Sequence, residues 1–197
     1  MSAVLEPTII ETVTAGVRLR RIRASEYERM IEAGIYTEND RLELLNGEII
    51  EIMPKGPKHT SVNSRILRYL IRLMGDRAIV RSQDPIRLDD FSEPEPDVVL
   101  AEPTEDEYAE NHPTPADILL IVEISDTTLV YDREDKSRAY SRNGIRHYLL
   151  INLQDETIED YREPGADGYG SKRTCRRGDR FNLVAFPEIE IGVEDLL

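Results

Sequence analysis

The sequence has few of the features that mark secreted or membrane-spanning proteins. A single cysteine, Cys175, among 197 residues excludes an intrachain disulfide and makes a reducing cytoplasm the expected location. No apolar run approaches the roughly 20 residues that cross a bilayer, so we expect no membrane partner. The first residues lack the basic flank and the apolar core of a signal peptide.

Positive charge is also scarce. Lys and Arg together number 25 against 39 Asp and Glu, and the formal net charge is −14. Proteins that coat nucleic acid do so by neutralising phosphates with Lys and Arg, so this balance excludes a general nucleic-acid coat. A local basic surface remains compatible with it.

The remaining composition is that of a globular protein. Hydrophobic residues make up 40% of the chain and charged residues 32%. A chain of this length forms one domain and buries roughly 70% of its unfolded surface. Residues 1–16 show no periodicity and are expected to form a loose N-terminal arm, which leaves 17–197 as a single domain.

The first structured elements are predicted to be a helix and a β-hairpin. Residues 17–22 alternate apolar and basic residues, which is typical of a short strand or the approach to a helix. Ser25 and Glu28 have the spacing of a capping box, and Gly34 is a helix stop. Asn46-Gly47 between two apolar runs is a strong hairpin signal, with strands at about 41–45 and 48–53.

The rest of the chain alternates helices and strands. Apolar residues at helical spacing predict a helix over 59–74, and Asp132 and Gly144 have the positions of caps for a helix over 133–142. An acidic, proline-rich loop spans 102–115. Strands or short β segments are predicted at about 78–80, 86–88, 98–101, 117–125, 147–151, 157–161, 171–176, 180–184 and 186–191, before a terminal turn at 193–197. The order predicts a mixed α/β domain with one central sheet.

One of these strands carries a carboxylate where none is expected. The apolar run 118–122 continues into Glu123 and Ile124, which predicts a strand covered on both faces. Burying an ionised carboxylate without a partner costs several kcal/mol or more. Glu123 is therefore either a strand-end residue that reaches water or a buried charge with a partner.

Two further carboxylates and a lysine are candidates for that partnership. Glu43 lies in the first predicted hairpin strand, Asp97 precedes the strand at 98–101, and Lys136 lies on the helix after Glu123. If the strands are neighbours, the carboxylates converge on one hard cation such as Mg²⁺, which prefers oxygen ligands. A Mg²⁺ with a bound water beside a lysine suits phosphodiester hydrolysis.

Each of these residues also has a plainer explanation. Alternation along a strand predicts a solvent-facing Glu43, and an aspartate after a proline, such as Asp97, often belongs to a turn. His59 has the position of a helix cap or a surface residue. Lys136 and Tyr140, four residues apart, are commonly one exposed and one packing position of a helix.

Five motifs occur in a fixed order: ELLNGE at 43–48, EPDVVL at 95–100, LIVEIS at 120–125, YDxxxKxxxY at 131–140 and GIxxYLLI at 144–151. In this order, over about residues 20–197, the chain closely resembles the Uma-type restriction endonucleases, a branch of the PD-(D/E)xK nuclease superfamily. The resemblance implies a restriction-endonuclease-like fold, an α/β (α+β) domain with a mixed central sheet flanked by helices. It also implies a Mg²⁺- or Mn²⁺-dependent endonuclease that acts on DNA.

The resemblance assigns roles to particular residues. Pro96-Asp97 matches the "PD" and Glu123 the "(D/E)", so both would ligate the metal, with the backbone carbonyl of Ile124 as a further ligand. Glu43 matches an accessory acidic residue. The lysine usually lies two residues after the acidic one, where this chain has Ser125. Lys136 on the following helix takes its place, and Tyr140 is expected to support it.

The DNA contacts and the oligomeric state are open. Two basic runs are candidates for phosphate contacts, although each alone is better explained as an ordinary solvated face. They comprise Arg65, Arg68 and Arg72, and Lys172, Arg173, Arg176, Arg177 and Arg180. Edge strands near the C-terminus would suit a homodimer. The alternatives to a nuclease are an interaction module that has lost the chemistry, and metal-free hydrolysis of glycosides by paired carboxylates.

Overall fold

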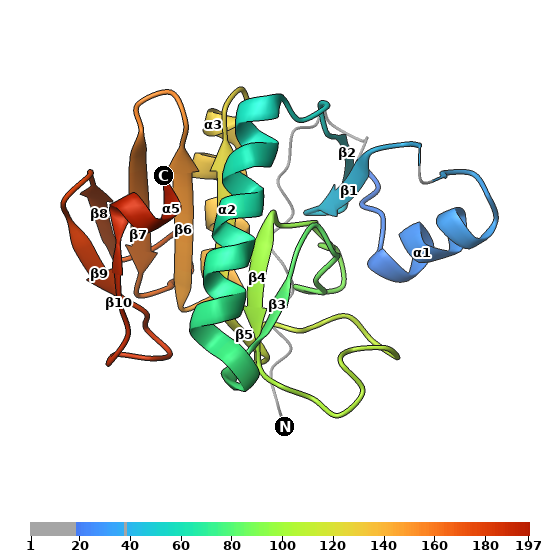
Figure 1. The fold of residues 1–197 in the computed structure, drawn as a ribbon. Helices are drawn as coiled ribbons and strands as arrows, with labels where there is room; N and C mark the ends of the chain where they lie inside the picture. The colour runs from blue at the N-terminus through green and yellow to red at the C-terminus, as the bar shows by residue number, and fades with distance from the viewer. Residues whose placement is uncertain (1–18, 38) are drawn as a thin grey trace.

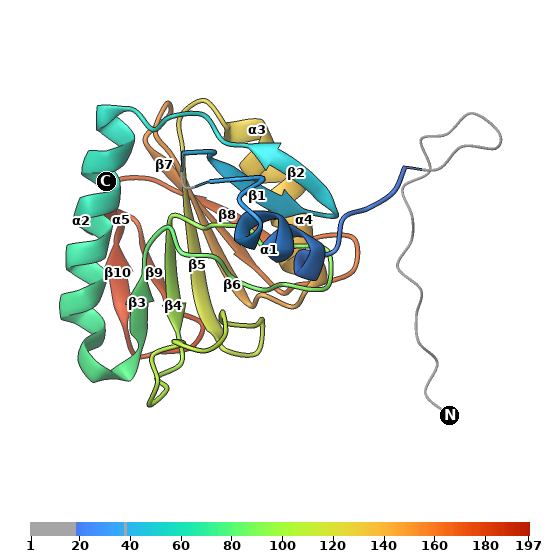
Figure 2. The ribbon, with the colours of Figure 1, turned by 90° about the vertical axis from the view of Figure 1, so that its right-hand side faces the viewer.

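The computed structural model describes residues 19–37 and 39–197. The arm predicted at 1–16 lies outside these residues. Figures 1 and 2 show a central sheet between two layers of helices and hairpins. In the part of the chain that the structure describes, no helix is long and apolar enough to cross a membrane.

The sheet is mixed, as the sequence predicted. Its six strands lie in the order β3-β4-β5-β6-β7-β8, and the β5–β6 pair is parallel while its other neighbouring pairs are antiparallel. The strands are β3 (Ile79–Arg81), β4 (Val98–Ala101), β5 (Ile118–Ser125), β6 (His147–Asn152), β7 (Thr157–Arg162) and β8 (Ser171–Cys175).

Helices cover both faces of this sheet. The long helix α2 (Pro57–Met74) lies along one face, and Figure 2 shows it on the opposite side of the sheet from α4. The second helical segment is continuous from α3 (Leu129–Tyr131) through the π-helical turn η2 (Asp132–Lys136) to α4 (Ser137–Arg142). The prediction of a mixed sheet flanked by helices is confirmed.

Strand β5 is the centre of the core, and all eight of its residues are buried. Alternate side chains point to opposite faces of a strand. Leu120, Val122 and Ile124 belong to the core cluster on the α2 side, whereas Ile121 belongs to the cluster that includes Tyr140. Glu123 has the same parity as Ile121, so its side chain points toward α4 and not toward α2.

A separate hairpin lies against the α4 side of the sheet. Strands β1 (Leu42–Leu45) and β2 (Glu48–Glu51) pair through a turn in which Asn46 and Gly47 have φ of 55° and 82°. Positive φ at both positions is the type I′ geometry expected for Asn-Gly. Helix α1 (Ala24–Glu32) packs on this hairpin through Ala24 and Tyr27.

Backbone hydrogen bonds join the hairpin to the segment that leads into β4. The Glu93 N–H donates to the Leu44 carbonyl over 2.7 Å, and the Gly47 N–H donates to the Phe91 carbonyl over 2.6 Å. The hairpin therefore has a fixed position relative to Asp97, which ends this segment. At the other end of the sheet, β9 (Arg180–Asn182), β10 (Glu190–Gly192) and α5 (Val193–Leu196) close the α2 side of the core.

Several local predictions were wrong. Helix α1 begins one residue before Ser25, because the Glu26 carboxylate accepts the Arg23 N–H over 3.0 Å. Residues 86–88 form no strand, since their N–H groups close a loop onto Pro94 and Ser92. The β segments predicted at 180–184 and 186–191 are shorter. The predicted terminal turn forms the short helix α5.

The hairpin turn generates a stability prediction. A Cβ at Gly47 would lie 2.6 Å from Cβ of Arg21, whereas a Cβ at Gly144, which has a similar φ of 79°, would meet nothing within 4 Å. We expect Gly144→Ala to lower the free energy of unfolding by about 1 kcal/mol through backbone strain alone. Gly47→Ala should lower it by about 2–4 kcal/mol because a steric clash is added. Urea titrations of both variants measure the difference, and equal losses would contradict the clash.

Candidate active site

The register of β4 on β5 brings two carboxylates face to face. Val98 pairs with Val122 and Val99 with Ile121, so continuing this register by one residue sets Asp97, which lies just before β4, opposite Glu123. The Glu123 side chain points to the α4 side of the sheet, and the Asp97 carboxylate lies beside the end of β5, where Oδ2 accepts the Ile124 N–H. The Asp97 N–H points at Glu123 Oε2, 3.4 Å away. Directly opposed side chains on one face have Cβ atoms about 5 Å apart, and like charges there are destabilising.

Glu123 is a buried carboxyl with partners and not a strand-end residue that reaches water, which resolves the alternative left open by the sequence. Its side chain is 4% exposed. Oε1 accepts hydrogen bonds from Lys136 Nζ over 2.9 Å and from the Tyr140 hydroxyl over 2.6 Å. Lys136 and Tyr140 are both buried, so neither is the exposed position of an ordinary helix.

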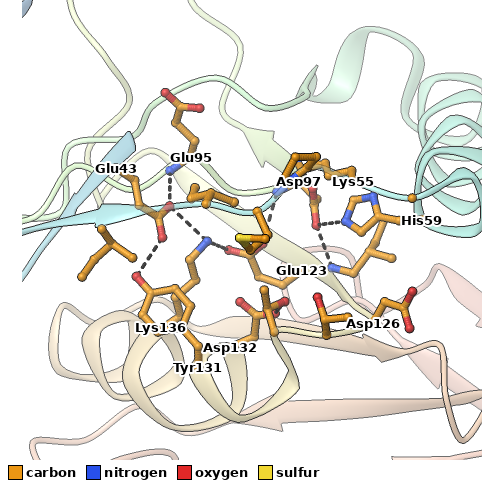
Figure 3. A pocket seen from close by; sticks show the side chains of 18 of the residues that line it. Glu43, Lys55, His59, Glu95, Asp97, Glu123, Asp126, Tyr131, Asp132 and Lys136 are labelled. Carbon is orange, nitrogen blue, oxygen red and sulfur yellow. Dashed lines mark hydrogen bonds and ion pairs between the residues drawn. The ribbon is translucent and has the colours of Figure 1, made fainter. Parts of the chain in front are cut away.

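Glu43 joins the same network from the hairpin. Lys136 Nζ lies 3.1 Å from Glu43 Oε2, which also accepts the Glu95 N–H over 3.1 Å. The Tyr131 hydroxyl donates to Oε1 over 2.8 Å. Glu43 is fully buried, so the solvent-facing alternative for it is wrong. Figure 3 shows the Lys136 ammonium between the Glu43 and Glu123 carboxylates.

The π-helical turn places Lys136. Asp132 was predicted to cap a helix, but it lies inside the helical segment and is buried. Its carboxylate accepts hydrogen bonds from the hydroxyls of Ser125 and Thr128. Ser125, at the usual position of the superfamily's lysine, thus connects the end of β5 to the helix. Such π turns often occur at functional sites.

Asp97 is held by one residue of the segment between β2 and α2 and by one residue of the first turn of α2. Lys55 Nζ lies 2.7 Å from Oδ1, and His59 Nε2 lies 3.0 Å from Oδ2. An ionised carboxylate only accepts hydrogen bonds, so His59 Nε2 is the donor and Asp97 Oδ2 the acceptor. The Ile124 N–H also donates to Oδ2, over 2.9 Å. His59 is buried, and it is neither a cap nor a surface residue.

The direction of the Ile124 N–H also places its carbonyl. In a strand, the N–H and C=O of one residue point to the same edge. The Ile124 carbonyl therefore faces the edge of β5 on which Asp97 lies. Ile124, Asp97 and Glu123 all line one pocket.

This pocket has a volume of about 470 Å³ and a large excess of acidic side chains. Seven carboxylates line it against two lysines and one histidine: Glu43, Glu51, Glu95, Asp97, Glu123, Asp126 and Asp132 against Lys55, Lys136 and His59. Among the described residues, no three His, Cys, Asp or Glu side chains are already grouped around a single metal position. The oxygen donors at Asp97 and Glu123 are instead satisfied by nitrogen and hydroxyl donors.

The two opposed carboxyls differ in proton affinity. Burial raises the pKa of Glu123 to about 8; Lys136 opposes this rise, and Asp132 and Asp97 add to it. Burial also acts to raise the pKa of Asp97, but His59 and Lys55 outweigh it and hold the pKa at about 2. Burial lowers the pKa of Lys136, yet Glu123 and Glu43 raise it well above its usual value. The pocket therefore favours bound positive charge.

Comparison with known proteins identifies the family of the chain. The sequence profile of the Uma2 family, described as "Putative restriction endonuclease", matches residues 24–194. The chain belongs to the Uma2 family. This membership supports a nuclease-type protein. A comparison with curated proteins found no match to the chain.

A solved structure shares the fold. It is the crystal structure of a "putative nuclease belonging to DUF820" from Anabaena variabilis ATCC 29413. The TM-score is 0.66 at 17% sequence identity, over 89% of this chain and 97% of that chain. At this identity the likeness concerns the fold, and it confirms the nuclease-like architecture inferred from the motifs of the Uma2 family.

The structure brings the ligand and catalytic residues implied by the Uma2 resemblance into one pocket, whereas Tyr140 and Ser125 lie behind it and the basic residues lie elsewhere. Tyr140 contacts Glu123 and not Lys136 directly, and Ser125 contacts Asp132. Arg65 and Arg68 are exposed along α2. Lys172 and Arg173 lie on β8, three strands and roughly 14 Å from β5. Lys172 is paired with Glu159 over 2.7 Å.

Sequence reasoning missed Lys55 and Tyr131 and underrated His59. Lys55 and His59 lie in or beside a Gly/Pro turn, where no periodicity indicates burial. Tyr131 opens the YDxxxKxxxY motif, but its contact with Glu43 depends on how the hairpin docks. For His59, the signal was its position four residues after Lys55 at the start of an amphipathic helix.

The buried cation between two carboxylates generates a prediction. Lys136→Met should lower the free energy of unfolding by about 3–5 kcal/mol, because Glu43 and Glu123 lose their buried counter-ion. Adding Glu123→Gln should cost less than the sum of the two single substitutions. Urea unfolding of the four proteins in this cycle measures the coupling. A loss below about 1 kcal/mol for Lys136→Met would contradict the assignment.

Proposed function

We propose that the chain is a metal-dependent endonuclease that hydrolyses phosphodiester bonds in DNA, with Asp97 and Glu123 as the protein ligands of Mg²⁺ or Mn²⁺. The observation that supports this most directly is that both side chains line one pocket and that the Asp97 N–H lies 3.4 Å from Glu123 Oε2. The Ile124 carbonyl, on the same strand edge, is the proposed third ligand. Glu43, Asp97, Glu123 and Lys136 are the proposed catalytic set.

The residues of the pocket fit a hard cation. The donors are oxygens, and the excess of seven carboxylates over two lysines leaves negative charge uncompensated. Mg²⁺ is held by one or two carboxylates in many nucleic-acid enzymes and keeps several waters. When bound, such an ion polarises a phosphate and supplies a water of lowered pKa.

The chain's own residues orient this site. His59 and the Ile124 N–H fix the rotation of the Asp97 carboxylate through Oδ2. Lys136 and Tyr140 do the same for Glu123 through Oε1. The other oxygen of each carboxylate has one contact: Asp97 Oδ1 pairs with Lys55, and Glu123 Oε2 lies 3.4 Å from the Asp97 N–H. This arrangement supports a ligand pair with a fixed direction and an available oxygen.

The charge distribution supports a small substrate footprint. The basic residues proposed to contact DNA are exposed, but Arg65 and Arg68 lie along α2, and Lys172 and Arg173 lie on the β8 edge. We propose that DNA is engaged at the pocket, with these residues contributing weakly. A cytoplasmic location and a homodimer through an edge strand remain predictions from the sequence.

Activity measurements test the proposed metal ligands. With Mg²⁺ or Mn²⁺ we expect nicking of plasmid and cleavage of single-stranded DNA by the wild type. Asp97→Asn and Glu123→Gln should each lower the rate by about a hundredfold or more, because even groups that only orient a metal ligand are worth 10- to 100-fold. Glu134→Gln removes an exposed carboxylate of the neighbouring helix and is the matched control.

Two results would sink the proposal. One is a wild type and an Asp97→Asn variant with equal cleavage. The other is a folded wild type that neither cleaves DNA nor binds Mn²⁺ in calorimetry, which would favour the interaction module. Inhibition of cleavage by a chelator and its recovery with Mn²⁺ separate a metal-dependent reaction from a contaminating activity.

His59 is proposed as a positioning residue for Asp97. Its buried Nδ1 has no hydrogen-bond partner among the described residues, so the ring's polar contact is the one to Asp97. We expect His59→Ala to weaken Mn²⁺ binding by about 10- to 100-fold. His59→Gln, whose amide can donate to Oδ2, should recover part of the loss. Calorimetry at fixed pH measures both, and an unchanged dissociation constant for His59→Ala would remove this role.

A further inference from the structure

The two lysines of the pocket have different environments. Lys136 is 5% exposed, and its ammonium lies between Glu43 and Glu123 at 3.1 and 2.9 Å. Lys55 is 23% exposed, and within residues 19–37 and 39–197 its ammonium forms an ion pair only with Asp97, over 2.7 Å. Lys136 is thus fixed by two buried partners, whereas Lys55 has one partner and access to solvent.

The position of Lys55 gives its side chain room to move. It belongs to the connection between β2 and α2, which forms one wall of the pocket. Lys55, Ile52 and Glu95 also line an adjoining hollow of about 380 Å³. The side chain therefore stands between two hollows. A lysine has a flexible four-carbon stem and a compact charge with three rotatable donors, so it can exchange one oxygen partner for another.

The ammonium of Lys55 also contacts the Asp97 oxygen that no other donor holds. It neutralises Oδ1 of Asp97, while the other oxygen, Oδ2, is held by His59 and the Ile124 N–H. Oδ1 is thus the oxygen left for a metal ion, and Lys55 covers it. An ammonium and a divalent cation cannot both take this position, because each needs the same lone pairs and they repel one another.

We propose that Lys55 is the resident counter-ion of Asp97 in the metal-free protein, that a divalent cation displaces it, and that the released ammonium then contacts a phosphate of the DNA. This inference rests on the proposed function and assigns the substrate-contacting lysine to Lys55. Lys136, held between its two carboxylates, keeps its place beside Glu123 in the proposed catalytic set.

Binding of Mn²⁺ to the metal-free full-length chain tests the displacement. By calorimetry at fixed pH, Lys55→Met should bind Mn²⁺ about tenfold more tightly than the wild type, because a charge-assisted hydrogen bond no longer competes for Oδ1. Lys58→Ala removes the same charge three residues away. The Lys58 side chain is 56% exposed, and its ammonium donates a hydrogen bond to the Leu153 carbonyl and not to Asp97. The dissociation constant of the Lys58→Ala variant for Mn²⁺ should therefore stay near that of the wild type.

Cleavage of single-stranded DNA at saturating Mn²⁺ tests the phosphate contact. Lys55→Met should cleave at least about tenfold more slowly despite binding the metal more tightly, whereas Lys58→Ala should cleave like the wild type. If Lys55→Met binds Mn²⁺ no more tightly than the wild type, or cleaves DNA at the wild-type rate, the inference about Lys55 is overturned. The proposed function is not affected by either result. A wild type that does not bind Mn²⁺ overturns both this inference and the proposed function.

Discussion

The opposition of Asp97 and Glu123 is the constraint on which the rest of the structure depends. The β4–β5 register places two carboxylates side by side on a buried face of the sheet, where like charges repel and hydration is lost. Neither charge is stable there without donors. Each is accordingly held by its own group of donors: Lys136 and Tyr140 on Glu123, and Lys55, His59 and the Ile124 N–H on Asp97.

These donors explain the elements that surround the sheet. The hairpin is hydrogen-bonded to the segment before β4, so it presents Glu43 to Lys136, and the connection after it carries Lys55 and His59 back over Asp97. On the other side, the Ser125–Asp132 contact ties the helix to the end of β5, and the π turn brings Lys136 inward. The hairpin connection, α2 and the helical segment after β5 thus each contribute a donor to Asp97 or Glu123.

Strong local patterns made much of this predictable from the sequence. The apolar run of β5, the Asn-Gly hairpin and the spacing of α2 each depend on nearby residues, and the structure has all three. Glu123 was singled out because a carboxylate within a buried apolar strand is costly, whereas the roles expected of Asp97, Glu43 and Lys136 came from the resemblance to the Uma-type nucleases. Lys55 and His59 were not, since their burial depends on the path of a Gly/Pro turn after the hairpin. Asp132 was wrongly taken as a cap because the helical segment already begins at Leu129, and the Asp132 carboxylate accepts hydrogen bonds from Ser125 and Thr128 instead of capping a helix.

The acidic character of the chain takes on a specific meaning at the pocket. Seven carboxylates against two lysines repel a phosphodiester, and the basic residues on α2 and β8 are too scattered to offset this. In the proposed nuclease, cation binding must therefore precede or accompany DNA binding. A divalent ion held by Asp97 would add two positive charges to the pocket, and the ammonium of Lys55, no longer paired with Oδ1, would be able to contact a phosphate. The Asp97 and Glu123 carboxyls, whose burial destabilises the fold, would then also make DNA affinity depend on a bound metal ion.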